Sequence, residues 1–88
     1  MAGGSFLVDT NVLIRWVQPE DASFPVAYAA VERMMLSSSF PCYVSQNLGE
    51  LWNVLTRPTH RNGYGLTPEQ AEVRVRKIET AFLLLPDS

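Results

Sequence analysis

The sequence contains one cysteine and one histidine in 88 residues, and only 18% of its residues are charged. The single cysteine, Cys42, excludes an internal disulfide and favours a reducing compartment. With 7 basic and 9 acidic residues, the formal net charge is -2, so the chain has no broad basic surface for nucleic acid. No apolar run is long enough to cross a bilayer, and residues 1–5 lack the features of a signal peptide. We therefore expect a cytoplasmic protein without membrane association.

The composition is otherwise that of an ordinary folded chain. Hydrophobic residues make up 47% of the sequence, which argues against disorder. The length predicts one small domain over residues 1–88.

The most informative stretch lies near the N-terminus, where two apolar runs flank Asp9, Thr10 and Asn11. The first run predicts a strand over residues 6–9, buried on both faces as in a parallel sheet. Asp9 then falls at the carboxyl end of the strand, where ligands bind in open α/β sheets. A turn or N-cap aspartate is the competing interpretation.

The rest of the chain predicts alternating helices and strands. Expected helices cover residues 12–17, a segment capped by Ser23, a segment capped by Ser45, and a segment starting at the capping box of Thr67 and Gln70. Expected strands cover residues 40–44 and 83–85, with a turn-rich loop over residues 59–66. The pattern predicts an α/β fold in which about three parallel strands are flanked by four helices.

Three of these helices show an apolar face, which in the segment capped by Ser23 holds Ala27, Ala30, Val31, Met34 and Met35. The other two are the segments that follow Ser45 and Thr67. The residues with helical spacing are Leu48, Leu51, Trp52 and Leu55 in one, and Ala71, Val75, Ile78 and Phe82 in the other. In the second helix, Arg74, Arg76 and Lys77 lie on other faces and are expected to be solvated.

Glu50 is the second candidate site residue, because it follows the second predicted strand by only a few positions. Alone, it is better explained as a solvated glutamate near a helix N-terminus. Together, Asp9 and Glu50 would lie at the same edge of the sheet, and two such oxygen ligands suit Mg²⁺ or Mn²⁺. A metal bound there can activate water and stabilise charge at a phosphodiester.

Two segments carry a resemblance to a known family: residues 7–14 (LVDTNVLI) and residues 44–58 (VSQNLGELWNVLTRP). With this separation and element order, the chain resembles the PIN-domain family, in particular the small ribonuclease toxins of toxin–antitoxin pairs. The resemblance implies a PIN-like sheet flanked by helices and Mg²⁺- or Mn²⁺-dependent cleavage of RNA. It also implies an antitoxin partner, homodimer formation and a cytoplasmic location.

The resemblance assigns roles to individual residues. Asp9 matches the family's first acidic position, Glu50 the second, and Asn11 the polar residue beside the metal. Arg57 and Arg61 are weaker candidates for phosphate contacts.

The family pattern continues beyond the third strand with further strands and acidic residues. Residue 87 is an aspartate, but it does not match any of those acidic positions. We therefore expect the chain to lack the C-terminal part of the family fold and to show little ribonuclease activity. We also expect the first strand to lack its outer neighbour and to favour a dimer through that strand or the helices beside it.

Two other functions stay open. One is a non-catalytic PIN-like interaction or oligomerisation module, which would keep the fold without a complete acidic cluster. The other is a phosphotransfer domain with Asp9 as acceptor, although no second acid stands near the first strand.

Overall fold

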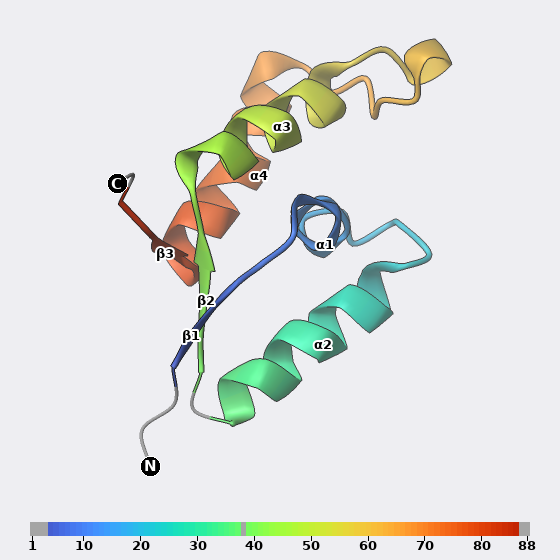
Figure 1. The fold of residues 1–88 in the computed structure, drawn as a ribbon. Helices are drawn as coiled ribbons and strands as arrows, with labels where there is room; N and C mark the ends of the chain where they lie inside the picture. Colours follow the sequence, from blue (N-terminus) through green and yellow to red (C-terminus); the bar gives the residue numbers. More distant parts are fainter. Residues whose placement is uncertain (1–3, 38, 87–88) are drawn as a thin grey trace.

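The computed structural model describes residues 4–37 and 39–86 (Figure 1); residue 87 therefore lies outside the described residues. The elements follow the order β1 (Ser5–Leu7), α1 (Thr10–Trp16), α2 (Phe24–Leu36), β2 (Phe40–Tyr43), α3 (Ser45–Thr56), the 3₁₀ turn η1 (Thr59–Arg61), α4 (Pro68–Ala81) and β3 (Leu83–Leu84). Among the described helices, none has the length and apolarity needed to cross a membrane.

The three strands form one parallel sheet in the order β1-β2-β3. Ser5 lies opposite Phe40, and Cys42 lies between Leu7 on one side and Leu83 on the other. The α/β class, with three parallel strands and four helices, is therefore confirmed. Within the described residues β1 pairs with β2 alone, so it is an edge strand.

The helices cover one face of the sheet. Both crossovers step in the same direction along the sheet, and right-handed crossovers then place their helices on the same side. Burial agrees, because Pro41 and Tyr43 are buried. On the other face Leu7, Phe40 and Leu83 are 58%, 59% and 54% exposed, while Cys42, which lies between Leu7 and Leu83, is buried.

The prediction of a first strand buried on both faces is therefore wrong. The strand also ends at Leu7 rather than at Asp9. The physical reason is that a sheet with all its helices on one side has two layers, and only alternate side chains of β1 reach the core.

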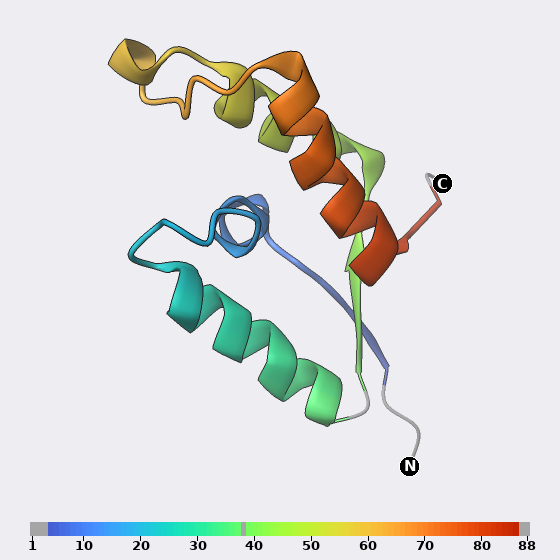
Figure 2. The same ribbon diagram turned by 180° about the vertical axis from the view of Figure 1, so that it is seen from behind.

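Helices α3 and α4 run antiparallel, whereas α1, seen nearly end-on in Figure 1, runs across the direction of α2. In Figures 1 and 2, α1 lies between α2 and the hairpin made by α3 and α4. The fully buried side chains at this meeting point are Leu13, Val17, Leu51, Leu55 and Ile78. Leu48 and Trp52 pack against this core, which confirms the predicted apolar face of α3.

Helix starts agree only in part with the sequence. At α4, Gln70 N–H donates to Thr67 Oγ1 at 3.2 Å and Thr67 N–H donates to Gln70 Oε1 at 2.9 Å, which confirms the capping box. Ser23 is the N-cap residue of α2, as predicted, but its backbone is already helical and its side chain makes no capping hydrogen bond. The N-cap of α3 is Val44, one residue before Ser45.

The first helix also differs from its predicted bounds. Helix α1 begins at Thr10, two residues earlier than expected, with Asp9 as its N-cap residue. The side chain of Asp9 makes no capping hydrogen bond. The Asp9 carboxylate therefore has no capping role in α1.

Arg74 is not solvated as predicted. Its Nη1 donates to the backbone oxygen of Val17 at 2.7 Å, and its Nη2 lies 3.7 Å from Glu20 Oε1. The carbonyl groups at the end of α1 have no partner in their own helix, which makes them natural acceptors for a cation. Tyr64 makes a second link between the two helix pairs, donating from its hydroxyl to Asp21 Oδ2 at 3.0 Å.

Candidate functional site

A cleft lies where α1 and α3 begin, at the carboxyl ends of β1 and β2. It has a volume of about 370 Å³, and its lining includes Asp9, Asn11, Glu50, Asn53 and Arg57. Parallel neighbouring strands end at the same edge of a sheet, so the residues that follow them come together. The two motifs singled out in the sequence therefore share one cleft.

A chain of hydrogen bonds connects the two motifs. The backbone N–H of Val44 donates to Asn47 Oδ1 at 2.8 Å, and Asn47 Nδ2 donates to Thr10 Oγ1 at 2.8 Å. Thr10 Oγ1 in turn donates to Glu50 Oε1 at 2.6 Å. The direction of every bond is fixed, because a backbone N–H can only donate and a carboxylate can only accept.

This chain holds the Glu50 carboxylate toward α1. Asn47 is only 9% exposed, so its amide is well shielded from water and its two bonds are correspondingly costly to lose. The bond from Thr10 uses one of the two carboxylate oxygens of Glu50, and each such oxygen has two lone pairs. Glu50 can therefore keep this bond and still bind a cation in the cleft.

The sequence prediction gave no role to Asn47 or Asn53. Asn47 stands three residues before Glu50 on α3, so the two side chains lie on the same face of the helix. That spacing is a usable signal, since a buried polar residue beside a candidate ligand suggests that it positions the ligand. The contact from Asn47 to Thr10, across 37 positions, has no local signal.

The donor set fits a strongly hydrated cation. In residues 4–37 and 39–86 no group of three or more His, Cys, Asp or Glu side chains could hold a metal. The cleft offers two carboxylates, Asp9 and Glu50, and the side-chain amides of Asn11 and Asn53. Mg²⁺ and Mn²⁺ are bound in this way, by one or two carboxylates while most ligands are water, whereas Zn²⁺ prefers His and Cys.

The two arginine candidates lie in different parts of the structure. Arg57 lines the cleft together with the carboxylates, at the C-terminal end of α3. Arg61 belongs to η1, in the loop between α3 and α4, and does not line the cleft. Asn62 follows it in the left-handed region with φ of 65°, a conformation that asparagine tolerates better than most residues.

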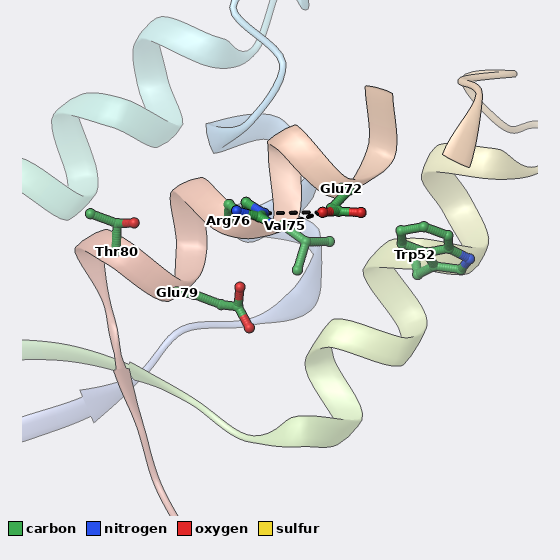
Figure 3. Close-up of a pocket in the computed structure, with 6 residues that line it drawn as sticks. All are labelled: Trp52, Glu72, Val75, Arg76, Glu79 and Thr80. Atoms are coloured by element: carbon green, nitrogen blue, oxygen red, sulfur yellow. Dashed lines mark hydrogen bonds and ion pairs between the residues drawn. The ribbon is translucent and has the colours of Figure 1, made fainter. Parts of the chain in front are cut away.

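A second hollow, of about 550 Å³, lies between α3 and α4 (Figure 3). Trp52 faces α4, where Arg76 Nη2 lies 2.7 Å from Glu72 Oε1 in an exposed ion pair. Burial and the nearby Glu79 carboxylate raise the pKa of the Tyr43 hydroxyl above its ordinary value. Because Arg76, the basic residue of its lining, already pairs with Glu72 and both are exposed, this hollow is a weaker candidate than the first cleft.

Comparison with protein-family models, curated proteins and solved structures finds no match to this chain. The likeness of residues 7–14 and 44–58 to PIN-domain proteins therefore stays a hypothesis. What the structure adds is that Asp9, Asn11 and Glu50, taken from these two segments, line one cleft.

Proposed function

We propose that this chain is a PIN-like, divalent-metal-dependent nuclease domain that acts on RNA phosphodiesters, as in toxins of toxin–antitoxin pairs. The observation that carries the proposal is the meeting of Asp9 and Glu50 in one cleft, with Glu50 held by Thr10. Two carboxylates beside amide side chains at the carboxyl edge of a parallel sheet are a reasonable site for Mg²⁺ or Mn²⁺.

In this proposal Asp9 and Glu50 hold the metal, and Asn11 orients a water molecule or a carboxylate. A metal bound there would lower the pKa of water and neutralise charge on the phosphate. Arg57, at the rim, would bind a phosphate oxygen through its guanidinium. Arg61 would contact a more distant part of the RNA, outside the cleft.

Metal binding is the first test. Titration of the protein with Mn²⁺, followed by water proton relaxation, should give a dissociation constant on the order of millimolar, because water fills most of the coordination shell. Asp9→Asn and Glu50→Gln should each weaken binding about tenfold or more. Glu69→Gln removes a charge from the exposed first turn of α4 and serves as the matched control. Equal binding by all four proteins would remove Asp9 and Glu50 from any metal site.

RNA cleavage is the second test. With two carboxylates in place of a larger acidic cluster, we expect slow cleavage that requires Mg²⁺ or Mn²⁺ and disappears in Glu50→Gln. Thr10→Val should slow the reaction while Thr10→Ser keeps it, since only the hydroxyl holds Glu50. Cleavage that continues in EDTA would contradict the proposal.

The second candidate function is a non-catalytic interaction module with the same fold. The lack of a third acidic ligand in the part of the chain that the structure describes favours it. A folded protein that binds neither Mn²⁺ nor RNA, but still forms a stable assembly, would support this alternative over the nuclease.

A further inference from the structure

The hollow between α3 and α4 combines an aromatic side chain with two carboxylates (Figure 3). Trp52 of α3 lines it on one side, and Glu72, Val75 and Glu79 of α4 line it on the other. The three residues of α4 are spaced by three and four positions, so they form a row on one face of the helix. The row has a carboxylate at each end and an apolar side chain between them.

The negative charge of this row is only partly neutralised. Arg76 donates to Glu72 from Nε at 3.2 Å and from Nη2 at 2.7 Å, and both bonds end on Oε1. Glu72 Oε2 is therefore still able to accept from a ligand. Among residues 4–37 and 39–86, Glu79 makes no ion pair. The hollow has two acidic groups and one basic group, so an excess of negative charge attracts a cation.

The spacing of the two carboxylates favours an elongated cation over a metal ion. Glu72 and Glu79 are seven positions apart on α4, which separates them by about 10 Å along the helix axis at about 1.5 Å per residue. The oxygen ligands of one metal ion lie within about 5 Å of each other. A flexible chain with a positive group at each end matches the row better.

From this arrangement we propose that the hollow binds a linear aliphatic polyamine, a chain of methylene groups that ends in ammonium groups. One ammonium group contacts Glu72 Oε2, and the other contacts Glu79. Figure 3 shows Glu72 directed toward Trp52, so the first ammonium group also lies beside the indole ring, where a cation–π interaction holds it. The methylene groups pack on Val75, which is half-buried and rests against the core.

This site is separate from the proposed nuclease site. No residue that lines the hollow also lines the cleft of Asp9 and Glu50. Polyamine binding can therefore be measured without metal or RNA, and its outcome does not depend on whether the chain is a nuclease.

Two diamines of equal charge and different length test the site, with the backbone amide shifts of the labelled protein followed by NMR. Octamethylenediamine can join both carboxylates, and at low salt it should bind with a dissociation constant on the order of millimolar, because exposed ion pairs are individually weak. The amides that shift should lie in α3 and α4. Putrescine, the tetramethylene diamine, reaches only one carboxylate at a time and should bind about fivefold more weakly.

Substitutions at exposed positions of α4 locate the ligand. Glu79→Gln should weaken the binding of octamethylenediamine about fivefold and remove most of its advantage over putrescine. Glu69→Gln is the matched control, because it makes the same charge change in the first turn of α4, outside the hollow, and it should leave the affinity nearly unchanged. Arg76→Gln should strengthen binding, since it removes the cation that competes for Glu72. All three residues are exposed, so the variants should keep the fold.

Four results would overturn the proposal. The first is an absence of binding at low salt, and the second is equal affinity for the two diamines. The third is equal weakening by Glu79→Gln and Glu69→Gln, which would show a general attraction to an acidic protein. The fourth is binding that disappears in Glu50→Gln but persists in Glu79→Gln, which would place the cation in the first cleft.

Discussion

The two helix pairs that connect the strands have the same architectural role and very different surfaces. Helix α2 exposes valine, leucine and methionine and carries two charged residues, whereas α4 carries six, among them the ion pair of Glu72 and Arg76. Helix α4 also starts with a complete capping box, which α2 lacks. The α3–α4 pair therefore presents a polar surface that suits contact with water, whereas the α1–α2 pair presents an apolar surface that suits burial.

The difference teaches that a crossover need only be apolar toward the sheet to build the fold. In the α3–α4 pair the remaining surface is polar, as expected for a helix in contact with solvent. In the α1–α2 pair the surface is apolar far beyond what the core requires, and folding of the single chain gives no reason for it.

The largest expected effect comes from creating a cavity in the hydrophobic core that the two helix pairs share. Leu51→Ala removes a fully buried side chain of α3 and should lower the free energy of unfolding by about 2–5 kcal/mol. Leu36→Ala removes a leucine that is 84% exposed on α2, and it should change the free energy of unfolding by less than about 0.5 kcal/mol. Urea unfolding measures both. Equal effects would mean that Leu36 is buried by a contact outside this chain.

The next effect concerns the link between the pairs. Arg74→Met should lower the free energy of unfolding by about 1–3 kcal/mol, because the Val17 carbonyl loses a charged hydrogen-bond donor from α4. Arg76→Met removes only the exposed pair with Glu72, and should cost less than about 0.5 kcal/mol. If the two variants unfold alike, the bond to Val17 does not hold the helix pairs together.

A smaller difference is expected at the two helix starts. Thr67→Ala should destabilise the protein by about 1 kcal/mol through loss of the cap on α4. Ser23→Ala should destabilise the protein less, because the Ser23 side chain does not cap α2 and its backbone N–H still donates to Asp21. Thermal unfolding of both variants beside the wild type measures the difference. A larger loss at Ser23 would contradict the helix start described for α2.

The smallest effect is a dependence on acid pH. The backbone N–H of Ser23 and, next, the Tyr64 hydroxyl hold the pKa of Asp21 below its usual value of 3.8. A pKa that is lower in the folded state gives stability that is present above the unfolded value and is lost as the pH falls through the folded value.

Asp21→Asn should remove this acid-dependent part of the stability, and Tyr64→Phe should remove only a portion, since Ser23 still donates. Unfolding curves between about pH 2 and pH 6 measure it. Identical pH profiles for wild type and Asp21→Asn would show that the carboxylate does not stabilise the folded chain.

Features set by local sequence were predicted well. The apolar face of α3 follows from residue spacing, and the capping box of α4 follows from Thr67 and Gln70, three residues apart. The meeting of Asp9 and Glu50 in one cleft was also predictable, because parallel strands bring the residues after them to a common edge.

Features set by distant contacts were not predictable in the same way. Arg74 finds its acceptor 57 positions away at Val17, and its place on α4 gives no sign of that partner. The open face of the sheet depends on the direction in which the crossovers step, which strand patterns alone do not determine. At Ser23 the sequence offers a good capping residue, but the donor to Asp21 is its own backbone N–H.

The strand order also has a consequence for biosynthesis. Because β1, β2 and β3 lie in the sheet in the order of the chain, each strand pairs with the one made before it. The strands β1 and β2 can therefore pair as soon as both have left the ribosome, without waiting for β3. The helix pair that carries most of the charge is the last part of the chain to join the sheet.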